Sequence, residues 1–136
     1  MDLVKTLKIS ASGLRAQTMR MRVSAENLAN ADTVADKPGG DPYRRKTISF
    51  KNILDKTINA PTVAVSQVGV DKTDFDMRYD PGHPAADANG YVKLPNVKTM
   101  VEMMDIREAQ RSYEANISAI EAAKNMLSRA VDLLRS

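Results

Sequence analysis

The chain has 136 residues, 4% of them aromatic, with no cysteine and a formal net charge of +3. Its length allows one domain, or one small domain with an elongated helical part, and the missing cysteines exclude disulfides and thiolate metal sites. The small charge surplus, which arises within residues 1–31, argues against nucleic-acid binding, and no apolar run approaches the roughly 18 residues of a membrane span.

Residues 3–31 are predicted to form a long helix. Apolar and small side chains recur there at alternating spacings of three and four, which is the a/d heptad pattern of a helix that packs on another helix. Asp2 precedes the pattern and is expected to cap the helix, with its carboxylate at the positive end of the helix dipole. Gly13 lies mid-helix, where glycine costs stability relative to alanine. Either another backbone approaches closely at this position, or the helix simply tolerates the glycine. The large seam residues of this helix are Leu7, Leu14, Met21 and Leu28.

Residues 34–96 have the composition of short β-strands and turns. We expect residues 71–74 to form the hairpin turn between the second and third strands, and Asn89–Gly90 to form a tight turn. Pro95 marks the start of the final helix, with Asn96 as its expected N-cap. Three or four short strands are predicted, at residues 45–50, 62–70, 75–79 and 91–93.

Residues 97–136 are predicted to form a second helix, of roughly 57 Å. Large apolar residues recur at a spacing of seven and alternate with small ones, so an apolar seam is expected to face the first helix. The predicted fold class is therefore α+β. Two long terminal helices, residues 1–33 and 97–136, form an α-helical coiled coil, and a small β-rich region, residues 34–96, is inserted between them. The large seam residues of the second helix are Ile106, Tyr113, Ile120, Leu127 and Leu134.

Both predicted helices carry a second apolar stripe, on the face opposite the seam. Chance enrichment in alanine is one explanation, but several members of the stripe are large. The β-rich region is too small to cover two long faces, so we expect assembly into a larger helical bundle in which the second stripes meet neighbouring subunits. The predicted inter-subunit assembly face consists of Ile9, Ala16, Val23, Ala115, Ala119, Ala122, Met126 and Leu133.

No group of residues predicts catalysis, a metal site or a cofactor site. His83 is the only histidine, and its Gly/Pro surroundings favour a solvated loop over a zinc ligand or a catalytic base. The aspartates within residues 71–80 miss the spacing of a calcium-binding loop. The basic run at residues 44–46 is expected to be a solvated strand edge that discourages pairing between sheets.

Several motifs resemble those of a known family. Residues 10–14 (Ser-Ala-Ser-Gly-Leu) and 27–31 (Asn-Leu-Ala-Asn-Ala) are similar to the N-terminal signature of bacterial flagellar rod, hook and hook-associated proteins. Later motifs resemble the basal-body rod proteins, in particular those of the proximal rod, and the resemblance runs nearly end to end. In the wider family, the corresponding threonine is followed directly by Gly-Tyr. In this chain a Pro/Gly loop follows Thr33, and the tyrosine comes only at position 43. The residues that carry the resemblance include Ser10, Gly13, Leu14, Asn27, Leu28, Ala29, Asn30, Tyr43, Arg44, Asn89, Gly90, Tyr91, Pro95, Asn96, Arg111, Tyr113 and Asn116.

The resemblance implies a structural subunit of the flagellar basal-body rod, in the periplasmic space. In that family the terminal helices of many copies, and of other rod subunits, pack into a tube that encloses the export channel and transmits torque. It also implies export by the flagellar type III apparatus, which fits the absence of a signal-peptide h-region at the N-terminus. Neither enzymatic activity, a cofactor, nucleic-acid binding nor membrane insertion is expected.

The alternative to a rod subunit is a small coiled-coil adaptor whose β-rich part is a ligand-binding module. An adaptor predicts a discrete, closed oligomer, whereas a rod subunit predicts open-ended contacts between different surfaces.

Overall fold

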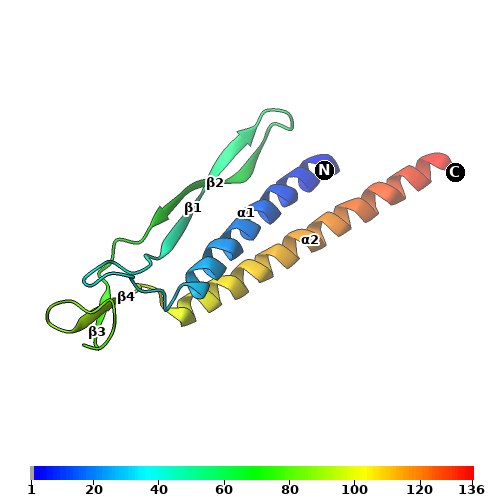
Figure 1. Ribbon diagram of the computed structural model, residues 1–136. Helices are drawn as coiled ribbons and strands as arrows, with labels where there is room; N and C mark the ends of the chain where they lie inside the picture. Colours follow the sequence, from blue (N-terminus) through cyan, green and yellow to red (C-terminus); the bar gives the residue numbers. More distant parts are fainter. Residues whose placement is uncertain (1) are drawn as a thin grey trace.

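The computed structural model describes residues 2–136. The chain begins with α1 (Leu3–Ala29) and ends with α2 (Thr99–Arg135) (Figure 1). Between the helices lie the strands β1 (Lys46–Asp55), β2 (Ala60–Val70), β3 (Asp76–Tyr79) and β4 (Tyr91–Leu94). Two terminal helices with a small antiparallel β region between them confirm the α+β fold class.

The predicted cap of α1 is confirmed. The Asp2 carboxylate accepts hydrogen bonds from the backbone N–H groups of Val4 (3.0 Å) and Lys5 (3.3 Å), two donors that have no partner within the helix. The helix ends two residues earlier than predicted, at Ala29. Its end is fixed by Asn30, whose backbone N–H and side-chain amide both donate to the Glu26 carbonyl, at 3.1 and 2.9 Å.

The two helices run antiparallel, with both chain termini at the same end of the molecule (Figure 1). The Asn116 side chain fills the space beside Gly13, so these two residues lie opposite each other in the antiparallel pair. Both helices rise equally per residue, so the start of α1, ten residues before Gly13, lies opposite Met126, ten residues after Asn116. Since α2 has 37 residues and α1 has 27, the last turns of α2 extend past α1. Leu127 and Leu134 therefore lie exposed, so their prediction as seam residues within this chain is wrong.

The expected N-cap of α2 is also wrong. Lys98 occupies the N-cap position and makes no capping hydrogen bond with its side chain. Asn96 lies two residues earlier, where its amide binds the backbone of other segments, as described below.

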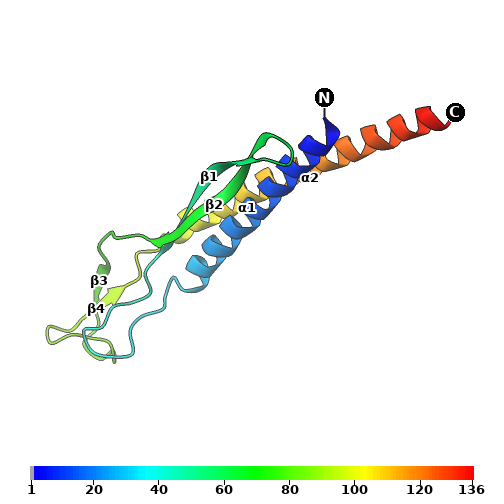
Figure 2. The ribbon, with the colours of Figure 1, turned by 90° about the horizontal axis from the view of Figure 1, so that it is seen from above.

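β1 and β2 form a long antiparallel hairpin that lies along α1 (Figure 2). The register pairs Lys46 with Val70 and Asp55 with Ala60, with a bulge after Ser49. Within residues 2–136 the hairpin packs on α1 and not on α2. β1 extends five residues beyond its predicted end. Residues 51–55 lack the alternating pattern of a strand, but residues 60–64 of β2 lie beside them and supply hydrogen-bond partners.

β3 and β4 form a separate two-stranded ribbon, in which Asp76 pairs with Leu94 and Tyr79 pairs with Tyr91. The predicted hairpin between the second and third strands is therefore wrong. Residues 71–74 are held instead by the start of β1, since the Asp71 N–H donates to the Arg45 carbonyl at 2.8 Å.

Residues 34–42 form a loop whose two ends meet. The Tyr43 N–H donates to the Thr33 carbonyl at 3.0 Å, and the Gly39 N–H donates to the Ala85 carbonyl at 3.2 Å. The inserted loop thus leaves Tyr43 next to Thr33 in space although nine residues separate them in sequence.

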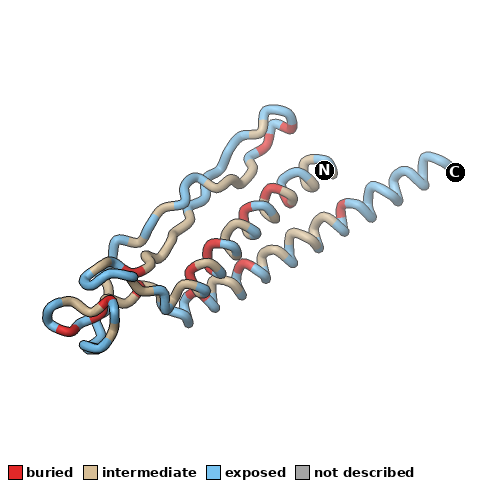
Figure 3. Tube along the Cα trace, in the orientation of Figure 1, coloured by how far each residue is buried: buried red, intermediate tan, exposed pale blue. Residues whose placement is uncertain are grey.

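The hydrophobic core is thin and discontinuous, as Figure 3 shows by its scattered buried segments. The largest fully buried side chains are Glu102, Val92 and Asn27, so two of these three are polar. Polar contacts therefore contribute more to holding this fold together than is usual in a globular domain. The buried apolar residues are Ala16, Val23, Ile58, Ala60, Ala85, Val92, Ala109 and Ala123.

Candidate functional site

The segment that leads into β1 crosses both helices and binds each of them. We call residues 43–46, together with Asn27, Asn96 and Glu102, the polar junction. The Asn27 side chain is almost completely buried and makes three hydrogen bonds. Its Nδ2 donates to the Lys46 carbonyl (2.9 Å), and its Oδ1 accepts from the Lys46 N–H and the Tyr43 hydroxyl, both at 2.8 Å. One amide on α1 therefore fixes the start of β1.

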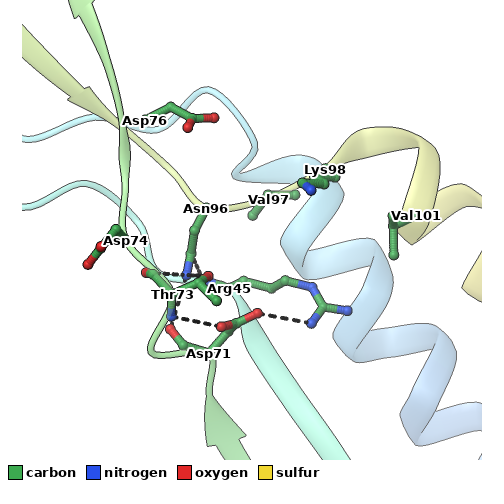
Figure 4. Close-up of a pocket in the computed structure, with 9 residues that line it drawn as sticks. All are labelled: Arg45, Asp71, Thr73, Asp74, Asp76, Asn96, Val97, Lys98 and Val101. Atoms are coloured by element: carbon green, nitrogen blue, oxygen red, sulfur yellow. Dashed lines mark hydrogen bonds and ion pairs between the residues drawn. The ribbon is translucent and has the colours of Figure 1, made fainter.

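Asn96 does the same on the other side of the junction. Its Oδ1 accepts from the Arg45 N–H at 2.7 Å, and its Nδ2 donates to the carbonyls of Asp71 (3.0 Å) and Thr73 (3.3 Å). Figure 4 shows these groups around a pocket of about 380 Å³ at the start of α2. Arg45, Asp71, Thr73 and Asn96 bind one another, so this part of the pocket is a structural joint, and Asp74, Asp76 and Lys98 complete its polar lining.

Arg45 connects the junction to α2 by charge. Its Nε donates to Glu102, whose side chain is 0% exposed, and its other nitrogens lie 3.5 Å from Asp71 and 3.7 Å from Asp105. The predicted solvated strand edge at residues 44–46 is therefore wrong, since Arg45 supplies the positive charge that a buried carboxylate requires. The second oxygen of Glu102 has no hydrogen-bond donor among residues 2–136.

The same contacts shift the pKa values of neighbouring groups. Burial, and the nearby charge of Glu26, raise the pKa of the Tyr43 phenol above its ordinary value. Hydrogen bonds from Thr73 hold the pKa of Asp71 below its ordinary value, and the Arg45 guanidinium lowers it further. Asp71 is therefore stabilised as the carboxylate, and Tyr43 as the neutral phenol.

The hairpin covers the second face of α1. Ser12 accepts a hydrogen bond from the backbone N–H of Val63 on β2 at 3.2 Å and donates to the Ile9 carbonyl at 2.6 Å. Ala16 and Val23 are only 2% and 5% exposed within the chain itself. Their prediction as part of an inter-subunit face is therefore wrong, because small residues on α1 allow the chain's own hairpin to approach closely. Ile9 remains exposed.

The outer face of α2 has no such cover. Residues Ala115, Ala122, Met126 and Leu133 of the predicted assembly face are exposed, and Ala119 is half-buried at its margin. Figure 3 shows exposed segments recurring along α2 and becoming continuous towards its C-terminal end. At 100° per residue, the exposed side chains of Met100 and Met104, which the sequence analysis did not include, fall on the same stripe.

The seam between the helices is built around small residues. Ala109 and Ala123 are buried, and a Cβ added at Gly13 would lie 2.8–3.0 Å from the Asn116 side chain. Gly13 thus marks a close approach, although its neighbour is a side chain and not a backbone. The predicted seam residues Leu7, Leu14, Met21, Leu28, Ile106, Tyr113 and Ile120 are half-buried.

Comparison with known proteins identifies the family. Residues 88–133 match the family described as flagellar basal body rod FlgEFG protein C-terminal. The chain is 49% identical to the flagellar basal-body rod protein FlgC of Agrobacterium fabrum, over 129 residues that cover 95% of this chain and 93% of that protein. It is 42% identical to the FlgC proteins of Bacillus subtilis and Salmonella typhimurium, again over at least 94% of each chain. The chain belongs to the FlgC family of flagellar basal-body rod proteins.

The residues that carry the family resemblance lie along α1, which contains Ser10, Gly13 and Leu14, and at three further places. Asn27, Tyr43, Arg44 and Asn96 belong to the polar junction, where Arg44 also lies 4.2 Å from the Phe75 ring centre. A second group surrounds the β3–β4 turn, and a third lies along α2. The second group is Asn89, Gly90 and Tyr91, and the third is Arg111, Tyr113 and Asn116.

The charged half of the junction, Arg45 and Glu102, is not predicted from the sequence. Glu102 was not singled out, although it lies seven residues before Ala109 and therefore occupies a seam position. An acidic residue in an apolar seam indicates a buried partner of opposite charge. That pattern predicts a basic partner for Glu102, but only the tertiary contacts identify the partner as Arg45.

His83 was the other candidate residue, and its contacts are structural. His83 is half-buried, and its Nδ1 accepts a hydrogen bond from the Ala85 N–H at 3.0 Å, so its side chain orders the loop. Within residues 2–136 no three His, Cys, Asp or Glu side chains are grouped to hold a metal ion. Nor does this part of the chain contain a helix with the length and hydropathy needed to cross a membrane.

Proposed function

We propose that this chain is a structural, non-enzymatic subunit of the flagellar basal-body rod, and that it assembles with neighbouring subunits through the outer face of α2. Family membership supports the rod assignment. The observation that carries the lateral contact is the uncovered stripe on α2, from Met100 to Leu133, which is about 50 Å long. Contiguous apolar surface of this kind is typical of interaction sites.

The stripe suits close packing between helices. Its middle contains Ala115, Ser118 and Ala122, whose small side chains allow another helix to approach, and methionines lie near both ends. Arg111 lies on the same stripe and can pair with a carboxylate on a neighbour. Ile9 completes the predicted assembly face on the α1 side.

In the proposed assembly the paired helices, residues 1–33 and 97–136, form the inner layer of the tube and residues 34–96 face outward. The hairpin supports this arrangement, because it covers α1 on one side and leaves α2 free. Such a tube would enclose the export channel and transmit torque. Its partners would be further copies and other rod subunits, delivered by the flagellar type III export apparatus to the periplasmic part of the basal body. Neither nucleic acid nor direct membrane insertion is part of this proposal.

The adaptor alternative has no specific support. Its predicted ligand-binding module would require polar groups that are free to bind a ligand, whereas Arg45, Asp71, Thr73 and Asn96 in the pocket of Figure 4 bind one another. The relatives are named as rod proteins.

The test is Ala122→Glu in a strain whose own copy of the gene is deleted. Ala122 is exposed in the single chain, so the variant should fold and reach normal levels. In the assembled rod its carboxylate would be buried without a partner, and rods and motility should be lost. Ala122→Ser, and Gln110→Glu at an exposed position about 120° around the helix, should assemble normally. Normal basal bodies in the Ala122→Glu strain would show that this face is not an interface.

A further inference from the structure

The turn before β4 contains two neighbouring residues that can react with each other. Asn89 is exposed, and its side-chain amide makes no hydrogen bond within residues 2–136. The next residue is Gly90, whose backbone nitrogen can attack the Asn89 side-chain carbonyl carbon, Cγ, and close a succinimide ring. Glycine favours this reaction, because it has no side chain to hinder the approach and its backbone rotates more freely than that of any other residue.

Asn89 is the only asparagine in the chain that precedes a glycine. The closest comparison is Asn59, which is also exposed and lies in the turn between β1 and β2, but Ala60 follows it. The Cβ of Ala60 hinders the attack and restricts the backbone rotation that it requires. The amides of Asn27 and Asn96 are held by hydrogen bonds in the polar junction. Chemistry and exposure therefore coincide only at Asn89.

Asp87 holds this turn closed. Its Oδ1 accepts hydrogen bonds from the backbone N–H groups of Asn89 (2.9 Å) and Tyr91 (3.0 Å). Its backbone carbonyl accepts from the Gly90 N–H at 3.0 Å, which is the group that must lose its proton before the nitrogen can attack. The turn therefore has to open before the ring can close. When opening and closing are fast, the rate of such a reaction follows the fraction of molecules in the open form.

We propose that Asn89 is a site of spontaneous covalent modification and that Asp87 sets its rate. The Gly90 nitrogen loses its proton and bonds to Asn89 Cγ, the bond between Cγ and Nδ2 breaks, and the side-chain nitrogen takes up a proton and leaves as ammonia. Water then opens the succinimide. Cleavage of the new bond gives aspartate, whereas cleavage of the original peptide bond gives isoaspartate, in which the chain runs through the side chain. The reaction consumes only water, so it occurs in the isolated chain whether or not the lateral contact is made.

The modification changes the closed end of the β3–β4 ribbon. Both products place a carboxylate close to that of Asp87, and isoaspartate also lengthens the backbone of the turn by a methylene group. The Gly90 carbonyl accepts a hydrogen bond from the Asp80 N–H at 2.9 Å, directly beside the paired residues Tyr79 and Tyr91. A longer turn displaces this carbonyl. The two tyrosine rings, which meet edge to face with centres 5.3 Å apart, therefore lose the backbone support that holds them together.

The test is incubation of the purified full chain at neutral pH. Peptide mass spectrometry follows the conversion of each asparagine, and an isoaspartyl methyltransferase labels the isoaspartate. Asn89 should convert well before Asn59, and Asn89→Gln should remove the isoaspartate label, because glutamine would have to close a larger ring. Asp87→Ala should speed the conversion about tenfold, since two hydrogen bonds to a charged acceptor are lost. Asp76→Ala removes the same charge at an exposed site at the start of β3 and should leave the rate unchanged.

Conversion of Asn89 no faster than that of Asn59 would overturn the modification site. An unchanged rate in Asp87→Ala, or equal acceleration in Asp76→Ala, would overturn the role of Asp87. Unfolding the unsubstituted chain in urea opens the same turn without a substitution, so it should also speed the conversion, and equal rates in urea and in buffer would show that the turn gives no protection. None of these outcomes bears on the lateral interface, which the Ala122→Glu strain tests separately.

Discussion

Replacing Arg45 by methionine tests whether the polar junction holds the fold together. The variant keeps most of the aliphatic stem but removes the guanidinium that faces Glu102, which is 0% exposed. An unpaired buried charge of this kind costs about 3–5 kcal/mol. Because the Arg45 side chain is 23% exposed and water can reach the vacated site, we expect the lower end of that range, about 3 kcal/mol. Against a typical stability of about 5–15 kcal/mol, such a loss is large.

The measurement is urea unfolding of the dilute chain at pH 7, followed by far-UV circular dichroism, with the free energy of unfolding from linear extrapolation. The matched control is Arg78→Met. Arg78 pairs with Asp80 at 3.8 Å and both side chains are exposed, so its loss should cost less than about 1 kcal/mol.

A double variant separates the buried charge from lost packing. Arg45→Met with Glu102→Met removes both charges and retains similar side-chain lengths, so it should recover about 2 kcal/mol relative to Arg45→Met alone. If Arg45→Met costs no more than Arg78→Met, or if the double variant recovers nothing, Glu102 is not a buried charge that depends on Arg45.

Two smaller predictions concern Gly13 and Tyr43. Gly13→Ala should stabilise the chain by about 1 kcal/mol through helix propensity only when Asn116→Ala is also present, because an added Cβ would otherwise lie 2.8–3.0 Å from the Asn116 side chain. Urea unfolding of Gly13→Ala with and without Asn116→Ala measures this. An equal gain in both backgrounds would contradict it. Because the pKa of Tyr43 is raised, its contribution to stability is complete below the unfolded phenol pKa of about 10 and is lost as pH rises through the folded value. Tyr43→Phe should therefore make the free energy of unfolding depend less on pH above about 10, and an unchanged pH dependence would refute this.

The two helices of this subunit have different surroundings, which bears on how a rod could be built. α1 is covered on one side by α2 and on another by the chain's own hairpin, so two of its faces are buried within the chain. α2 has the uncovered outer face and an uncovered end. In the proposed assembly α2 therefore makes most of the lateral contact, while α1 and the junction hold it in position.

The helices, and with them the fold class, could be predicted from sequence because their signals are local. The heptad spacing of residues such as Leu7 and Leu14 repeats every two turns, and the Asp2 carboxylate caps donors only two and three residues away. The family motifs are also local in the sequence, and the comparisons confirm the family that they indicated, the flagellar basal-body rod proteins. The β1–β2 strands were also located, since β-branched residues are concentrated there.

Only the tertiary structure decided which surfaces are covered. Periodicity identifies a helix face as apolar but does not name its partner, and for Ala16 and Val23 that partner is the chain's own hairpin rather than a neighbouring subunit. The deciding contacts join residues far apart in sequence, such as Ser12 with Val63 and Arg45 with Glu102, separated by 51 and 57 positions. Such contacts form only when the whole chain has folded, so no local pattern around Asn96 or Arg45 could reveal that these residues connect strand to helix.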